Sequence, residues 1–381
     1  MMIYLDYAAT TPMSSRALET YTEVAQHCFG NTNSPHDFGD AADRLLASCQ
    51  KQIARHLHVE ASAIFFTSGG SDSNLLAIAG IAHARRKKGN HLIYVQGQHS
   101  SVVLAFERLR EEGFSVTELK RRADGEVDLS TLEDALREDT ILVSVDHVNN
   151  EIGSINNLNA IGKLLFNKKI AFHCDAVQSY GKLPIDAEAA HITALSASAH
   201  KIYGPKGVGL CYVDPRAAFQ PQLPGAPKQG LSPGTVNLPG ISAFVTATED
   251  AYRYAEAMLC HVNDLRQRFI AGIQKKGISF LVEASAHHQL PHILALRIPG
   301  IEGQQIMLAA NQRGLSIATG SACSSTAHQP SPTLRSIGRS AEEARELVRL
   351  SFGETTTNEE LDQAINLFAA AVSEVQAATR A

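Results

Sequence analysis

The sequence lacks the features that mark membrane, secreted or nucleic-acid-binding proteins. It has no run of the roughly 18 apolar residues that a transmembrane helix needs, so we expect no membrane partner. The opening residues, MMIYLDYAATTP, show no basic stretch followed by an apolar one, which argues against a secretion signal. The formal net charge is only −5, whereas proteins whose main task is to bind nucleic acid are usually basic, so we expect no nucleic-acid partner.

Cysteine is scarce as well. Six cysteines in 381 residues are too few for a disulfide scaffold, and no two of them are spaced as Cys-x-x-Cys. We therefore expect a cytoplasmic protein with reduced thiols. The length suggests about two domains, and a hydrophobic content of 44% is enough for a sizeable core and excludes a disordered chain.

Short apolar runs alternate with amphipathic segments from residue 63 to about residue 213. Such strands, separated by helices, indicate a mainly parallel sheet that is covered on both faces. The predicted strands are residues 63–67, 91–95, 115–119, 141–146, 170–174, 192–197 and 208–213. We predict an α/β fold with a large domain, residues 14–254, in which a mainly parallel seven-stranded sheet lies between helices.

A second, smaller pattern follows the large domain along the chain. A long helical stretch over 242–276 leads to strands at 292–298 and 315–319, with a helix at 302–313 between them and a closing helix at 358–378. We predict a smaller α+β domain, partly antiparallel, formed by residues 1–13 together with 255–381.

Polar residues that could react with or bind a ligand follow three of the predicted strands. Lys201 ends a strand beside His200 and Gly-rich sequence, where a lysine can have a lowered pKa and form a Schiff base. Asp175 follows another strand and could pair with the protonated ring nitrogen of pyridoxal phosphate. Residues 67–71 (TSGGS) lie between a strand and a helix, where backbone amides can bind phosphate.

Each of these three features is weak alone, and a surface lysine is the more common reading of Lys201 taken by itself. Their order along the chain is more informative, because each of them follows a strand. In parallel sheets, ligands bind beyond the carboxyl ends of the strands. Together, the phosphate-binding turn, the carboxylate and the lysine form a specific pattern.

On these residues the chain resembles the cysteine desulfurases of the class V, fold-type I pyridoxal phosphate enzymes. The resemblance spans nearly the whole chain. Its motifs are residues 4–12 (YLDYAATTP), 30–31 (GN), 67–71 (TSGGS), 149–153 (NNEIG), 175–178 (DAVQ), 198–207 (SAHKIYGPKG), 320–323 (GSAC) and 348–353 (VRLSFG).

The resemblance implies pyridoxal 5'-phosphate as cofactor, L-cysteine as substrate and a role for each matching residue. Lys201 would bind the cofactor covalently, and its phosphate would be held by Gly70, Ser71, Ser198, His200 and, from a neighbouring subunit, Thr235. The ring would contact Asp175 through its nitrogen, Gln178 through its hydroxyl, and His99 by stacking. Asn150, also in the cofactor pocket, and Arg349 would bind the substrate carboxylate, Arg349 through a bidentate pair. The role of Thr235 implies a homodimer.

Cys323 decides which reaction the resemblance implies. It lies in residues 318–332, which are rich in Gly, Ser, Thr and Pro and lack helical or strand periodicity, so we predict a mobile loop. A thiol on such a loop can reach a substrate and carry sulfur away as a persulfide, with Lys201 and His99 moving protons. The implied product is L-alanine, and the sulfur would pass to an acceptor protein. The other cysteines lie in predicted helices and strands, and we interpret them as structural: Cys28, Cys49, Cys174, Cys211 and Cys260.

The chain departs from the family pattern in the Gly- and Pro-rich segment 224–237. Ser232 stands where the family carries an arginine, and a His-Glu pair is missing, although Lys228 could compensate. A catalytically impaired homologue that acts as a scaffold or binding partner therefore stays open. A selenocysteine lyase stays open as well, because Cys323 does not exclude selenocysteine as the substrate. The retained Cys323 argues against an aminotransferase.

Two further clusters do not predict a site. His287, His288 and His292 have no carboxylate or thiol at ligand spacing beside them, so we expect no metal. Residues 207–209 (GVG) lack the third glycine and the acidic residue of a dinucleotide-binding fingerprint, which argues against a nicotinamide cofactor.

Overall fold

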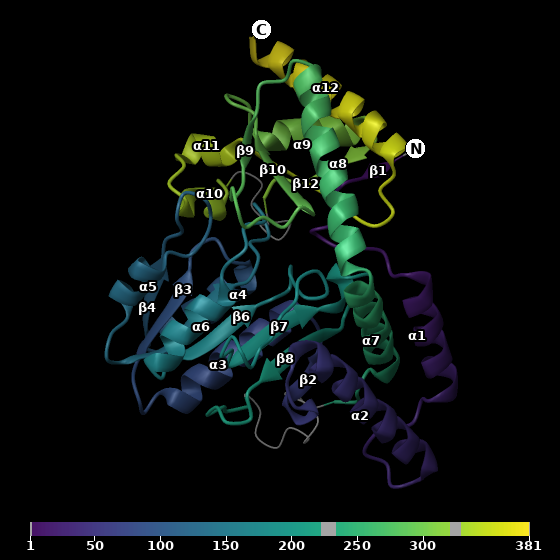
Figure 1. The fold of residues 1–381 in the computed structure, drawn as a ribbon, viewed down its shortest axis with the longest axis vertical. Coiled ribbons are helices and arrows are strands. Elements are labelled where there is room, and N and C mark those ends of the chain that lie inside the picture. Colours follow the sequence, from purple (N-terminus) through teal and green to yellow (C-terminus); the bar gives the residue numbers. More distant parts are fainter. Residues whose placement is uncertain (1, 222–233, 321–328, 381) are drawn as a thin grey trace.

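A computed structural model describes residues 2–221, 234–320 and 329–380. It contains a seven-stranded sheet, a three-stranded sheet and a two-stranded sheet among the described residues (Figure 1). The strands of the large sheet are β2 (Ile64–Thr67), β3 (His91–Val95), β4 (Ser115–Leu119), β5 (Thr140–Asp146), β6 (Ala171–Asp175), β7 (Ala194–Ser198) and β8 (Gly209–Val213).

The large sheet has the strand order β2-β8-β7-β6-β5-β3-β4. Only β8 runs against its neighbours, pairing antiparallel with both β7 and β2, and the other pairs are parallel. The prediction of a mainly parallel seven-stranded sheet is confirmed. Every residue of β3, β5, β6, β7 and β8 is buried, which explains why these strands appear in the sequence as continuous apolar runs.

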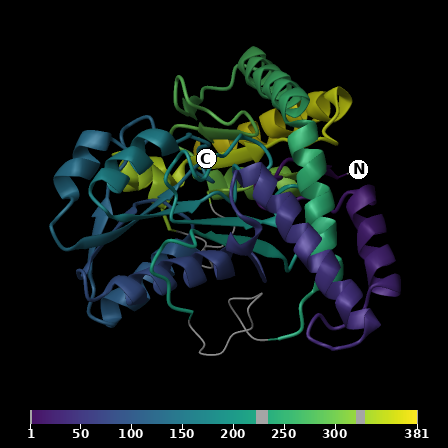
Figure 2. The same cartoon turned by 60° about the horizontal axis from the view of Figure 1, so that its bottom comes forward.

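Helices cover both faces of this sheet (Figure 2). Because side chains alternate along a strand, Ile93 and Val95 of β3 enter one core and Leu92 and Tyr94 enter another. The first core includes residues of α1 (Ser15–His27), α2 (Asp37–Leu57), α5 (Leu129–Ala135), α6 (Leu158–Asn167) and α7 (Leu238–Arg253). The second core includes residues of α3 (Gly70–Arg85) and α4 (Ser100–Glu111).

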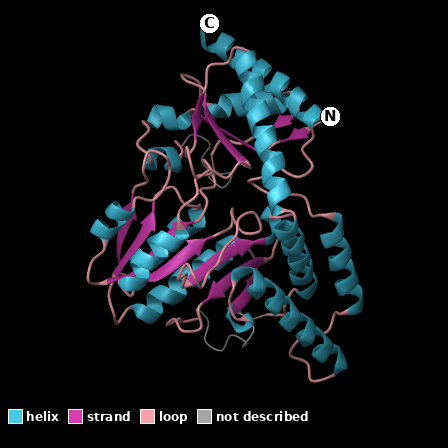
Figure 3. Ribbon diagram, in the orientation of Figure 1, coloured by secondary structure: helices cyan, strands magenta, loops and turns pink. Residues whose placement is uncertain are grey.

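The smaller unit combines the first residues of the chain with its last third (Figure 3). Its antiparallel sheet has the order β12-β10-β9, and β1 pairs parallel with β11. A separate hydrophobic core joins Ile3 and Leu5 to Phe269, Phe352 and Phe368. The elements are β1 (Ile3–Tyr4), α8 (Ala255–Lys275), β9 (Leu281–Glu283), β10 (Ile293–Arg297), α9 (Gly303–Gln312), β11 (Leu315–Ser316), α10 (Pro332–Ser336), α11 (Ala341–Arg345), β12 (Leu347–Ser351) and α12 (Asn358–Arg380).

The long helix expected over 242–276 is two helices. It begins earlier, at Leu238, and is broken at Tyr254, whose backbone lies outside the helical region with φ −107 and ψ 8. The second of these helices, α8, extends from the large sheet to the smaller unit (Figure 1). The expected strand at 315–319 is also shorter, ending at Ser316. The domain boundaries at residues 13/14 and 254/255 stay a prediction.

No helix in the described ranges is both long and apolar enough to cross a membrane.

His173, a buried histidine in β6, makes the free energy of unfolding depend on pH. His173 lies between Ser144 and Ser196, with ring nitrogens 2.8 and 3.1 Å from their hydroxyl oxygens. Burial lowers the pKa of His173 to about 3. In the unfolded chain, His173 becomes protonated as the pH falls below about 6.5, whereas in the folded protein it stays neutral down to about pH 3. The free energy of unfolding is therefore unaffected by this group above pH 6.5 and decreases as the pH falls from 6.5 toward 3.

We expect His173→Gln to flatten the pH dependence of stability. Between about pH 6 and pH 4, the wild-type free energy of unfolding should fall more steeply than that of the variant, by about 1.4 kcal/mol per pH unit. Urea unfolding across this range measures the difference, with His27→Gln on the exposed side of α1 as the matched control. Equal slopes for wild type and His173→Gln would contradict the assignment of a neutral buried imidazole.

Candidate active site

Ten of the predicted site residues line one cavity of about 170 Å³. It lies at the edge of the large sheet where β6 and β7 end and α3 begins. The ten residues are Gly70, Ser71, His99, Asn150, Asp175, Gln178, Ser198, His200, Lys201 and Arg349. Thr235 is exposed and does not line this cavity, and Cys323 lies outside the described residues.

The phosphate-binding turn predicted after β2 is present. Helix α3 begins at Gly70, so its first backbone amides lack partners within the helix and can bind an anion. The loop packs tightly against the first residue of β8, because a Cβ on Gly209 would lie 2.5 Å from the Gly69 carbonyl carbon. Asp72 closes the turn by accepting hydrogen bonds from the Ser68 amide and hydroxyl, both at 3.0 Å.

Ser198, the last residue of β7, adds an unsatisfied hydrogen-bonding group to this turn. Its hydroxyl is buried and has no partner among the described residues. Gly70 and Ser198 are close neighbours, since a Cβ on Gly70 would lie 3.4 Å from the Ser198 Cβ. A buried hydroxyl without a partner is costly, so an anion in the turn would satisfy it.

Asp175 ends β6 with its carboxylate buried. Asn74 of α3 donates a hydrogen bond to one oxygen at 2.8 Å, and the amide of Val177 donates to the other at 3.0 Å. Burial raises the pKa of Asp175, an effect that a cation placed in the cavity would oppose. The position therefore suits a cationic ligand atom.

Lys201 is held by the N-terminal segment of the chain. It lies in a short 3₁₀ turn directly after β7, and its Nζ donates to the carbonyl oxygens of Ala8 at 2.7 Å and Ala9 at 2.8 Å. Gln178 also donates to Ala8, at 2.9 Å, which leaves its Oε1 buried without a partner among the described residues. The segment 8–9 thus fixes an amine and an amide beside the cavity.

Two histidines face the cavity in their neutral forms. His99 is the N-cap of α4, where its Nδ1 accepts from the Ser101 amide at 3.2 Å. Burial, reinforced by the charge of Lys201, lowers the pKa of His99. Burial likewise lowers the pKa of His200 to about 4, and its Nδ1 lies 3.1 Å from the Thr10 hydroxyl. Both lowered pKa values favour the uncharged imidazole at neutral pH, in which one ring nitrogen can accept a hydrogen bond.

Arg349 is buried in β12 and is no exposed charge at a strand edge. Only 1% of its surface is exposed. One guanidinium nitrogen donates to the Asp6 carboxylate at 2.8 Å and another to the Asn150 carbonyl at 2.9 Å, while Nε has no partner among the described residues. A buried guanidinium with a remaining donor suits a carboxylate ligand.

Sequence reasoning missed two polar residues that line the cavity, Asn74 and Asp146. Asn74 follows Gly70 by four residues, so it faces the cavity one helical turn later, a spacing that could have found it. Asp146, the last residue of β5, lines the cavity, and Arg121 binds it through two hydrogen bonds of 2.7 and 2.8 Å. No sequence signal joins Arg121 to Asp146 or Asp6 to Arg349.

The remaining predictions concern segments away from the cavity. Lys228 and Ser232, like Cys323, lie outside the described residues. Of the other cysteines, Cys49, Cys174 and Cys211 are buried, Cys28 is half-buried and Cys260 is exposed on α8. Within the described ranges, no cluster of three or more His, Cys, Asp or Glu side chains could hold a metal ion.

The family of the chain follows from comparison with known proteins. The model of the family "Aminotransferase class-V" matches residues 3–364. The chain belongs to the class-V aminotransferase family. It is 40% identical, over 96% of both chains, to a putative cysteine desulfurase NifS of Halalkalibacterium halodurans. It is 38% identical to a cysteine desulfurase IscS of Anaeromyxobacter sp., over 96% of this chain and 91% of the relative.

Solved structures agree with this family assignment. A NifS-like protein superposes with a TM-score of 0.91 at 29% identity, covering 98% of this chain and all of the other. SspA in complex with cysteine superposes with a TM-score of 0.80 at 32% identity, covering 92% of this chain and 98% of the other. The α/β fold predicted from the sequence is the fold of these class-V proteins.

Proposed function

We propose that this class-V protein is a pyridoxal-phosphate-dependent cysteine desulfurase that converts L-cysteine to L-alanine. One observation carries the proposal: the phosphate-binding turn, Asp175, Lys201 and Arg349 come from four distant parts of the chain and line a single cavity. The relatives named as cysteine desulfurases support the choice of substrate.

The cavity fits pyridoxal phosphate at three points. The amides of α3 and the unpartnered Ser198 hydroxyl would hold the phosphate. The buried Asp175 carboxylate would pair with the protonated ring nitrogen, and the unpartnered Gln178 Oε1 would accept a hydrogen bond from the ring hydroxyl. Lys201 Nζ, in the same cavity, would form the covalent link.

The bound cofactor supplies an electron sink that stabilises negative charge at the substrate α-carbon. The protein's own residues do the remaining work. Asp175 would keep the ring nitrogen protonated, and the amine of Lys201 would take the substrate α-proton. His99, held neutral by burial, accepts or donates the proton at the substrate thiol.

Arg349 and Asn150 would orient the substrate through its carboxylate. The guanidinium is buried, and its contacts to Asp6 and the Asn150 carbonyl fix its plane before substrate arrives. A carboxylate bound by two parallel hydrogen bonds places the α-carbon within reach of Lys201.

Cys323 would receive the sulfur as a persulfide. Its thiolate attacks the substrate sulfur, an S–S bond forms and the C–S bond breaks, and the electron pair moves to the carbon skeleton. Protonation of that carbon skeleton then gives L-alanine. An acceptor protein's thiolate next attacks the outer sulfur of the persulfide, which regenerates the Cys323 thiolate and delivers sulfur for iron–sulfur cluster, thionucleoside or other cofactor synthesis.

We further propose a cytoplasmic homodimer. Thr235 is exposed and lies away from the cavity of its own chain, which supports a contact with the cofactor phosphate of a neighbouring subunit. The reduced state that the Cys323 thiol requires supports a cytoplasmic location.

The proposal is tested by incubating purified holoenzyme with L-cysteine and a thiol reductant. We expect alanine and sulfide in equal amounts. A folded, cofactor-loaded protein that forms neither product would contradict the desulfurase and favour the scaffold. Selenocysteine offered in place of cysteine distinguishes the lyase: a selenocysteine lyase would release selenide and leave cysteine unreacted.

We expect Arg349→Lys to raise the KM for L-cysteine by about tenfold to a hundredfold, with a smaller change in kcat. A lysine keeps the charge but cannot form two parallel hydrogen bonds to a carboxylate. Initial rates over a range of cysteine concentrations separate the two constants, and Arg313→Lys, whose partner is Glu374, is the matched control. An unchanged KM would place the substrate carboxylate elsewhere.

A further inference from the structure

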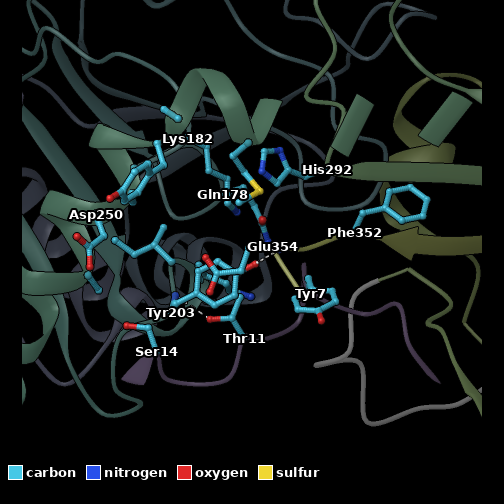
Figure 4. Close-up of a pocket in the computed structure, with 18 of the residues that line it drawn as sticks. Tyr7, Thr11, Ser14, Gln178, Lys182, Tyr203, Asp250, His292, Phe352 and Glu354 are labelled. Atoms are coloured by element: carbon cyan, nitrogen blue, oxygen red, sulfur yellow. Dashed lines mark hydrogen bonds between the residues drawn. The ribbon is translucent and has the colours of Figure 1, made fainter. Parts of the chain in front are cut away.

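A second cavity of about 260 Å³ adjoins the proposed active site (Figure 4). Ala8, Gln178 and Lys201 line both cavities. We call the second one the junction cavity, because its walls come from α1, α7 and the turn after β7 on one side and from α8, β10 and the residues that follow β12 on the other. The proposed reaction does not use it.

Apolar side chains form most of the wall of the junction cavity. Ala251 of α7, Ala255 and Met258 of α8, Ile293 of β10 and the buried Phe352 all contribute. A cavity of this size and composition binds the apolar part of a small molecule.

Charge is distributed unevenly around this apolar wall. Lys182 and His292 form its basic end, where the charge of Lys182 helps burial to lower the pKa of His292. Glu354 and Asp250 form its acidic end, and Figure 4 shows Glu354 below His292. Asp250, close enough to Glu354 to help raise the pKa of its carboxyl, is paired with Arg16. The acidic end therefore already has a cation, Arg16. The basic end, formed by Lys182 and His292, has no anionic partner among the described residues that line the cavity.

Lys182 forms no ion pair with any residue in the described part of the chain. Burial, with a smaller contribution from the charge of Lys201, lowers the pKa of the Lys182 ammonium to about 7. An anion beside the ammonium would reverse this effect and stabilise the charged form.

His292 provides a second, independent sign of a missing ligand. Its side chain is 7% exposed and lines the cavity, yet its Nδ1 has no hydrogen-bond partner within the described ranges. The ring is neutral, because burial keeps the pKa of His292 well below its usual value. A buried polar atom left without a partner costs free energy unless a bound molecule or water satisfies it.

We propose that the junction cavity is a second small-molecule site, which takes a compact monocarboxylate with an apolar body. The carboxylate lies at the end formed by Lys182 and His292, and the apolar body lies along Ala251, Ala255 and Met258. Because Gln178 and Lys201 border both cavities, the occupant lies directly behind the residues that hold the cofactor.

Octanoate and its uncharged analogue octanamide test this site by isothermal titration calorimetry on the holoenzyme. We expect octanoate to bind saturably and about tenfold or more tightly than octanamide, because only the carboxylate pairs with Lys182. Lys182→Gln should reduce the affinity for octanoate to that for octanamide. The readout is binding, so it stands or falls separately from the desulfurase activity.

A matched pair of variants on α8 locates the binding. Ala255→Leu fills the junction cavity and should abolish binding of octanoate, whereas Ala257→Leu, on the exposed side of the same helix, should leave it unchanged. The absence of saturable octanoate binding to wild type would overturn the proposal. Equal affinities for octanoate and octanamide, or octanoate binding that survives both Lys182→Gln and Ala255→Leu, would overturn it as well.

Discussion

Replacing Cys323 with alanine is expected to reduce alanine and sulfide formation from L-cysteine by at least about a thousandfold. The substrate C–S bond then lacks the thiolate that takes the sulfur, while every group that would hold the cofactor is retained. The yellow absorbance of the bound cofactor should therefore persist. Quantifying both products from wild type and Cys323→Ala under identical conditions measures the loss.

Cys260→Ala is the matched control for this prediction, because Cys260 is an exposed thiol on α8, away from the cavity. It should keep wild-type activity. If Cys323→Ala still released sulfide at the wild-type rate, another group would carry the sulfur and the role of Cys323 would be wrong.

Lys201→Ala is expected to lose at least about a thousandfold in activity together with the covalently bound cofactor. The amine that would form the Schiff base and take the α-proton is missing, and the carbonyls of Ala8 and Ala9 each lose the hydrogen bond from Lys201. Borohydride reduction of the wild-type holoenzyme, followed by peptide mass analysis, should find the cofactor attached at Lys201. Lys163→Ala, on the exposed side of α6, should retain both the cofactor and the activity.

Attachment of the reduced cofactor to a different lysine would contradict the assignment. Lys182 is the informative alternative, because it also lines a cavity that borders Lys201. Modification there would exchange the roles that we give to the two lysines.

The sheet could be predicted from the sequence because its central strands are buried on both faces. The range 91–95 matches the buried strand β3 residue for residue. The range 115–119 likewise matches β4, although β4 is an edge strand and only partly buried. Strand order could not be derived, because it depends on pairings between segments far apart in the chain, such as β2 with β8. The break at Tyr254 was missed because the helical period continues across it.

The site was predictable where its residues follow strands. Asp175 is the last residue of β6, and Lys201 lies in the short turn that follows β7. The two strands are parallel neighbours and end at the same edge of the sheet. The partners of these residues were not predictable. Asp6 pairs with Arg349 only because β12 lies beside the first residues of the chain. The same N-terminal segment places the carbonyl of Ala8 where it accepts a hydrogen bond from Lys201.

The altered segment 224–237 contributes none of the described residues that line the cavity. Its Lys228 and Ser232 lie outside the described residues, and the ten cavity residues come from other parts of the chain. We therefore expect its departures from the family pattern to act through the contact between subunits, as the role proposed for Thr235 implies.

Mapping the sulfur atom after a single turnover tests the central claim most directly. Purified holoenzyme is mixed with L-cysteine in the absence of reductant, exposed thiols and persulfides are trapped by alkylation, and peptides are analysed by mass spectrometry. We predict one added sulfur atom on the peptide that contains Cys323, in an amount equal to the alanine formed. Alanine formed without sulfur on Cys323, or sulfur found on Cys260 instead, would contradict the account.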